Sequence, residues 1–507
     1  MTQRYPSRLL IAGLFLGLAF DVLFTGKMLG LSVPLFALLL LAGLGLAVRW
    51  EGAQVFRANL WLPAALLFFA GMVLLRASVL LTSLNVCTAL VLCGLLAFSL
   101  TQDSLARRSL PALLFAPLEA LLLSMERGGR VTAHVVRHDL QGVPRPSRQR
   151  ASSILKGLLL AVPVLLVFVP LLASADVIFA EMVERVLELE FLADLLDWAS
   201  HGLVVLPIGL LAAGGLAYAV RSRQEPSPGS SGARLPRLLG FTEATVLMNT
   251  MNALFLLFVG VQLPYLFGGR LNITPSGFTY AEYARRGFGE LVTVAVATLG
   301  LLLVLQAMTR RESPRQERAF NLSATLLLGL TCVMLASAFK RLLLYETAYG
   351  FTQLRLYVHV FMAWLGILLA WFALTLWRRP QRLALGVLIV ALGFTGTLDL
   401  LNPDAFIVRQ NMQRYQGTIL PTSSTSLYAR QIDVGYLTSL SEDAVPALFA
   451  LAEQSPVATR RLIEEDLQQR LVTMEESTSW RRWQSFHVSR SRAYQLLLQR
   501  YKGGSHG

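Results

Sequence analysis

The sequence predicts an all-α fold: a polytopic transmembrane helix bundle of about eleven spans, in a range of roughly nine to eleven, followed by a small all-helical extracytoplasmic C-terminal domain. Of the 507 residues, 54% are hydrophobic and only 15% are charged, against about 25% charged in soluble domains. Several apolar runs approach or exceed the roughly 18 residues that predict a span. Basic residues concentrate in short segments beside these runs, as the topology rule for membrane proteins requires.

Apolar runs matched to a bilayer core of roughly 30 Å place the individual spans. Only Arg76 and Ala77 separate the third run from the fourth, so residues 60–99 form either two full spans or a re-entrant hairpin. Residues 110–125 contain two prolines and are expected to lie along the membrane surface as an interfacial helix. The expected spans are 9–24, 29–48, 60–75, 78–99, 153–173, 199–220, 241–267, 285–308, 320–340, 353–377 and 382–401.

Loop charges predict which ends of the spans share one side of the membrane. Segments 101–152 and 221–240 are rich in arginine, whereas 174–198 is acidic. Because basic loops stay in the cytoplasm, we expect a cytoplasmic amino terminus and an extracytoplasmic tail. The chain then divides into N-terminal membrane helices (1–100), a basic cytoplasmic loop with an interfacial helix (101–152), two spans flanking an acidic outer amphipathic helix at 177–197 (153–220), a flexible cytoplasmic linker (221–240), a C-terminal membrane bundle (241–401) and a soluble helical tail (402–507).

The tail differs from the rest of the chain because it is rich in charge. Three helix starts are expected, at Asn402-Pro403, at Ser441-Glu442-Asp443 and at Ser455-Pro456, each a cap residue before a proline or a first-turn acid. Besides the lipid bilayer, a protein partner is the expected contact of this tail or of the basic loop 101–152.

Several classes of chemistry lack their motifs. The net charge of +14 lies beside apolar runs, which favours a topology signal over nucleic-acid binding. The three cysteines form no CxxC pair, and no GxSxG or HExxH motif is present. His134 and His138 are four residues apart but lie in the basic loop. We therefore expect no catalytic residue, no metal site and no cofactor.

Polar side chains within the spans are the candidate site, because a charge at bilayer depth costs about 2.5–3.5 kcal/mol on insertion scales. In span 241–267, Asn249 and Asn252 share one helix face with Thr245. Hydrogen bonding between helices is the alternative interpretation of this face. The candidates for a ligand site or polar network are Glu243, Asn249, Asn252, Glu282, Arg285, Arg286, Arg341, Glu346, Arg355 and His359.

Residues 340–360 form the most polar stretch between two clear spans. Gly350 is expected to break the helix there. Arg355 and His359 are four residues apart and point the same way, so a buried pair of this kind needs Glu346, Glu282 or a bound anion as partner. We expect one polar site near the outer ends of the eighth to tenth spans, with a purely structural ion-pair network as the alternative.

Four stretches carry a family resemblance: YAEYARRGF at 280–288, FKRLLLYETAYGFTQLRLYVH at 339–359, DVGYLTSLSEDAVPAL at 433–448 and WRRWQSFHVSRSRA at 480–493. Together they resemble an uncharacterised family of bacterial multi-spanning membrane proteins known only as a domain of unknown function. The resemblance is strongest over residues 240–500. It implies a shared fold and a location in the bacterial cytoplasmic membrane, and it implies no activity, catalytic residue or cofactor.

Three functions remain open at this point. A non-catalytic sensor, regulator or assembly scaffold explains the elaborate tail and loops without catalytic groups. A transporter or channel for a small or anionic solute would use the polar residues of the seventh to tenth spans, although no inverted repeat is evident. An intramembrane enzyme ranks third, because no nucleophile with a base and no metal set is present.

Overall fold

The computed structural model describes residues 4–55, 57–100, 105, 108–139, 190–220, 238–267, 288–378, 382–416 and 432–502. These parts of the chain are helical, and Leu239 and Thr309 form an isolated bridge. Within them, ten helices are long and apolar enough to cross a membrane. They are α1 (Pro6–Phe24), α2 (Ser32–Glu51), α3 (Trp61–Leu75), α4 (Val79–Ser99), α8 (Glu190–Ala219), α9 (Phe241–Phe267), α11 (Phe288–Met308), α12 (Pro314–Tyr349), α13 (Gln353–Trp377) and α14 (Leu383–Leu401).

The predicted polytopic helical membrane fold is confirmed by these ten helices. Residues 60–99 contribute two of these helices, α3 and α4. The short helix α3 is long enough to count because a 3-10 turn at Arg57–Asn59 extends it. The predicted span 153–173 lies outside the described residues, as do residues 177–189 of the predicted outer helix. The last residues of that outer helix, from Glu190, belong to α8 and continue without a break into the next span.

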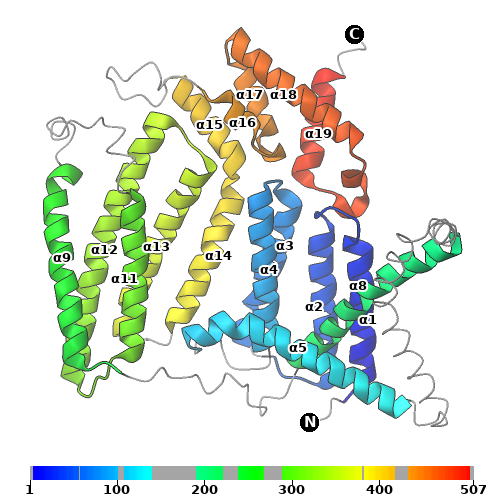
Figure 1. Ribbon diagram of the computed structural model, residues 1–507, viewed down its shortest axis with the longest axis horizontal. Helices are drawn as coiled ribbons and strands as arrows, with labels where there is room; N and C mark the ends of the chain where they lie inside the picture. Colours follow the sequence, from blue (N-terminus) through cyan, green and yellow to red (C-terminus); the bar gives the residue numbers. More distant parts are fainter. Residues whose placement is uncertain are drawn as a thin grey trace, which may run out of the picture.

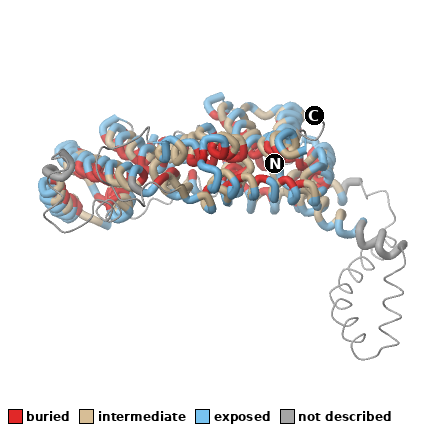
Figure 2. Tube along the Cα trace, turned by 90° about the horizontal axis from the view of Figure 1, so that it is seen from above, coloured by how far each residue is buried: buried red, intermediate tan, exposed pale blue. Residues whose placement is uncertain are grey.

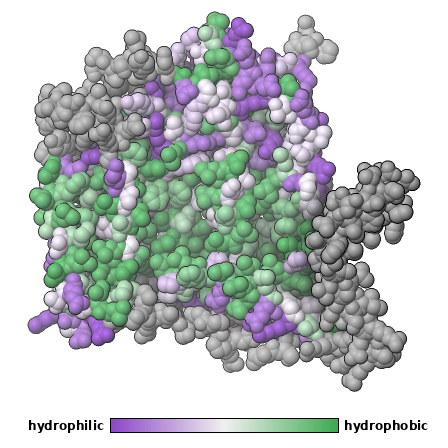
Figure 3. All heavy atoms as spheres, viewed as in Figure 1, coloured by the Kyte–Doolittle hydropathy of each residue, from purple (hydrophilic) through white to green (hydrophobic). Residues whose placement is uncertain are grey.

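The membrane helices stand side by side in a flat, elongated layer (Figures 1 and 2). One buried core joins α1 to α4, α5 (Leu110–Asp139) and α8, and a second joins α9, α11, α12 and α13. Helix α14 contributes Ala384 and Leu388 to the first core and Leu383 to the second, so it connects the two groups. On the face drawn in Figure 3, an apolar belt crosses the middle of the layer, with polar surfaces above and below it.

Glycines allow the closest helix contacts in the first group. A Cβ on Gly13 or Gly17 of α1 would overlap α8 at Ala213 or Val205. This GxxxG spacing is typical of membrane helices, because lipid supplies no hydrophobic drive for association and close backbone packing replaces it. Gly214 of α8 lies equally close to Ser124 of α5.

Helix α5 (Leu110–Asp139) runs across the ends of α1, α4 and α8 on the side opposite the tail (Figure 1). It is longer than the expected interfacial segment 110–125 and continues through Pro117, whose ring packs on Gly94 of α4. Ala116 and Ala120 are buried against the bundle, while Phe115 and Leu122 are exposed. Apolar residues on both faces suit a helix that lies between protein and lipid.

The tail is a helical unit with its own buried core. It contains α15 (Pro403–Tyr415), α16 (Val434–Thr438), the 3-10 turn η8 (Glu442–Ala444), α17 (Val445–Glu453), α18 (Val457–Glu476) and α19 (Val488–Tyr501). Asn402 and Ser441 cap their helices as predicted, each accepting a backbone N–H through its side-chain oxygen. A helix also starts at Ser455-Pro456 as predicted, since α18 begins at Val457. Ser455 does not cap it, because its hydroxyl donates to the carbonyl oxygen of Leu451.

Candidate functional site

The polar residues of α9 bond to the neighbouring helix α12. The Oδ1 atom of Asn249 accepts the hydroxyl of Ser323 at 3.0 Å, and the Nδ2 atom of Asn252 donates to the Ser323 carbonyl at 3.0 Å. Glu243 accepts the backbone N–H of Gly240 at 2.9 Å and so closes the first turn of its own helix. The two asparagine contacts join α9 to α12, which is the ordinary role of amides at membrane depth.

A second group ties the other end of α9 to α12. The Oε1 atom of Gln262 accepts the hydroxyl of Ser337 at 2.9 Å and the guanidinium of Arg341 at 3.0 Å. Arg341 therefore lies between α9 and α12, apart from Arg355. Arg341 and Arg355, two described members of the predicted site, thus make separate contacts.

Glu346 and His359 form a buried pair between α12 and α13. The Nδ1 atom of His359 lies 3.0 Å from the carboxylate of Glu346, a fully buried residue. The imidazole packs edge-on against the ring of Phe339, with 4.1 Å between the two ring centres. A carboxylate at this depth is stabilised by sharing a proton or an ion pair with its neighbour. The pair holds the last turns of α12 against the first turns of α13.

Arg355 faces α12 as well, but it does not pair with Glu346. Its guanidinium lies 4.2 Å from the ring centre of Tyr345 and donates to the carbonyl oxygen of Gly350 at 2.5 Å. Among the described residues, no carboxylate lies within 4.0 Å of it. Glu282, Arg285 and Arg286, the other expected members of the site, lie outside the described residues.

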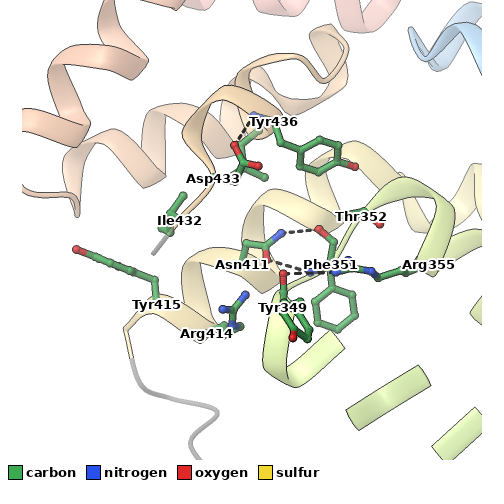
Figure 4. A pocket seen from close by; sticks show the side chains of 11 residues that line it. Tyr349, Phe351, Thr352, Arg355, Asn411, Arg414, Tyr415, Ile432, Asp433 and Tyr436 are labelled. Carbon is green, nitrogen blue, oxygen red and sulfur yellow. Dashed lines mark hydrogen bonds between the residues drawn. The ribbon is translucent and has the colours of Figure 1, made fainter. Parts of the chain in front are cut away.

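Arg355 lines a cavity of about 210 Å³ where the α12–α13 turn meets the tail (Figure 4). Helix α15 supplies Asn411 and Arg414 to the opposite wall. Asn411 holds the turn in place, because its Oδ1 accepts the N–H of Phe351 at 3.0 Å and its Nδ2 donates to the Phe351 carbonyl at 2.9 Å. We call this cavity the arginine pocket, lined by Tyr349, Phe351, Thr352, Arg355, Asn411, Arg414, Tyr415, Ile432, Asp433, Tyr436 and Leu437.

Two guanidinium groups therefore share one small space. Burial lowers the pKa of Arg414, and the positive charge of Arg355 lowers it further. Asp433 is the acid in the lining, and its carboxylate accepts the N–H of Tyr436 at 3.0 Å as the cap of α16. Burial raises the pKa of Tyr436, which stays neutral and accepts the N–H of Gln353 at 2.7 Å. Paired guanidiniums beside neutral hydroxyls favour a small oxyanion.

Three buried aspartates connect helices, two of them between the tail and the membrane helices, and none was predicted as a site residue. Asp399 accepts the amide of Asn85 at 2.8 Å, across α14 and α4. Asp404 accepts the side chain of Gln353 at 2.6 Å, and Asp443 accepts the N–H of Ala77 at 2.9 Å. Burial raises the pKa of Asp443. Asp399 had a detectable signal, because an acid inside the expected span 382–401 is costly unless it is bonded.

The fold and the pocket define a class: a polytopic helical membrane protein whose helical tail encloses a polar site at one end of the bundle. Within the described parts of the chain, no group of three or more His, Cys, Asp or Glu side chains is placed to hold a metal ion. The chain belongs to the family described as Domain of unknown function (DUF4153), whose model matches residues 63–451. No curated protein and no solved structure matches it.

Proposed function

We propose that the protein is a non-catalytic sensor or regulator of the bacterial cytoplasmic membrane that binds a small oxyanion in the arginine pocket. The observation that carries this proposal is the meeting of Arg355 and Arg414 in one cavity. Arg355 uses backbone carbonyl and ring contacts in place of an acidic partner. A planar guanidinium of this kind offers two parallel donors to a carboxylate or phosphate.

The position of the pocket favours sensing. Arg355 belongs to a membrane helix and Arg414 to the tail, so a bound anion would contact both parts of the molecule. An anion that contacts both guanidiniums stabilises the arrangement in which the two arginines are close, and it shifts the population toward that arrangement. A protein bound to the tail, or a scaffold assembled on it, would then respond to the solute.

The orientation belongs to the same proposal. The basic connection at 309–313 and the facing ends of α13 and α14, together with α5, lie at the end of the bundle opposite the tail (Figure 1). Basic segments favour the cytoplasmic side, which supports a cytoplasmic amino terminus and a tail outside the cell. The arginine pocket would then meet solutes of the extracytoplasmic space.

Thermal unfolding of the full-length protein in detergent tests the pocket, with inorganic phosphate and succinate as probes. We expect at least one probe to raise the melting temperature of the wild type. Arg355→Lys and Arg414→Lys should weaken the apparent affinity about tenfold, because lysine lacks the planar fork. Arg311→Lys is the matched control, since Arg311 also bonds a carbonyl oxygen and an aromatic ring but lies at the opposite end of α12.

Equal stabilisation of the wild type, both pocket variants and the control would contradict binding in this pocket, as would no stabilisation by either probe. Uptake of the stabilising probe into proteoliposomes separates sensing from transport. A sensor binds the probe without accumulating it inside the vesicles. Uptake that requires Arg355 would instead establish the transporter alternative.

A further inference from the structure

A second cavity lies between the tail and the turn that joins α3 to α4. It measures about 490 Å³ and shares no lining residue with the arginine pocket. The end of α3, one face of α15, the η8–α17 segment and the start of α19 form its walls. The lining residues that matter here are Leu75, Arg76, Arg409, Met412, Glu442, Asp443, Ala450, Val488 and Arg492.

Three arginines of this cavity have no acidic partner among the described residues, and one of them, Arg76, donates to the carbonyl oxygen of Asp399 at 2.6 Å. Asp443 is bonded by the N–H of Ala77 at 2.9 Å and by the hydroxyl of Ser489. Glu442 lies 3.6 Å from Arg490. By contrast, Arg409 and Arg492 have no carboxylate within 4.0 Å among the described residues. The cavity thus has two guanidiniums that can bind an anion.

The cavity also has an apolar wall and lies at the edge of the membrane. Met412, Ala450 and Val488 supply carbon surface beside the two arginines. Leu75, the last residue of α3, lines the cavity and is 38% exposed, and Val79 at the start of α4 is 81% exposed. Because α3 and α4 are membrane helices, the turn between them lies at the end of the membrane bundle that faces the tail (Figure 1). A small water-soluble anion has no apolar group to contact such a wall, whereas a phospholipid presents a phosphate and an acyl chain together.

We propose that this cavity binds the headgroup of a glycerophospholipid, with Arg409 and Arg492 holding the phosphate and the apolar wall contacting the start of the acyl chains. Guanidinium groups bind phosphate oxygens through charge-assisted hydrogen bonds. A lipid bound here would contact α3, α15, α17 and α19 at once. It would fasten the tail to the leaflet on its own side of the membrane.

Native mass spectrometry of the delipidated full-length protein, titrated with phosphatidylglycerol, tests the proposal. The double variant Arg409→Gln/Arg492→Gln should bind phosphatidylglycerol at least about tenfold more weakly than the wild type. Arg461→Gln/Arg500→Gln is the control, because it removes two guanidiniums from the tail outside the cavity. The control should retain phosphatidylglycerol like the wild type.

Ala450→Phe is a second variant, which keeps both arginines and fills the space beside the apolar wall. It tests lipid binding in this cavity if the double variant does not fold. Ala450→Phe should also bind phosphatidylglycerol more weakly than the wild type. Unchanged retention in a folded double variant, or in Ala450→Phe, overturns the proposal. Complete displacement of phosphatidylglycerol by inorganic phosphate also overturns it, because the cavity would then be a site for a free anion.

Discussion

At the scale of single residues, the buried imidazole of His487 makes the stability of the tail depend on pH. Burial lowers the pKa of His487 from its ordinary value of 6.5. The unfolded tail therefore binds a proton that the folded tail does not, and the free energy of unfolding falls as the pH drops below 6.5. When the pH is lowered from about 7.5 to about 5.5, the melting temperature of the wild type should fall further than that of His487→Asn. This variant retains a side-chain oxygen that can cap α19. Asp443, whose raised pKa acts in the opposite direction, is present in both proteins. Equal losses would contradict this role of His487.

At the scale of elements, the turn from α12 to α13 depends on Gly350. Its φ of 82° and ψ of 173° belong to a region that only glycine adopts without strain. A Cβ there would also overlap the side chains of Asn411 and Arg414. Gly350→Ala should destabilise the protein by about 1–3 kcal/mol and weaken anion binding in the arginine pocket. Gly329→Ala is the control, since a Cβ at that position of α12 meets nothing within 4 Å. Equal melting temperatures for the two variants would rule out a strained turn.

At the scale of the whole molecule, the proposed orientation places the tail and both cavities on one side of the membrane. Fusions to alkaline phosphatase and to a fluorescent protein after Gly142, Gly232 and Gly435 test this orientation. Phosphatase activity is expected only at Gly435, and fluorescence only at Gly142 and Gly232, because basic segments remain in the cytoplasm. Fluorescence at Gly435 with no phosphatase activity would show that the number of spans has the opposite parity.

Part of the candidate site follows from local sequence patterns, and part does not. The four-residue spacing of Arg355 and His359 predicted that the two side chains point the same way, and in the structure both contact residues of α12. Arg414 was missed, because an arginine in a charged amphipathic helix is ordinarily a solvated residue. Arg409 and Arg492 were missed for the same reason. Nothing in a single helix reveals which of its exposed arginines will face a cavity.

The sequence by itself determined the class of the molecule, because hydrophobic length is a local property that sets whether a segment can cross a bilayer. It also determined the helix-breaking role of Gly350 and the caps at Asn402 and Ser441. The tertiary structure decided the partners: Glu346 bonds His359 and leaves Arg355 to the arginine pocket, and Asp443 bonds Ala77, 366 residues away. Such pairs depend on how whole helices pack, and polar groups in a membrane bundle take the nearest partner that packing provides.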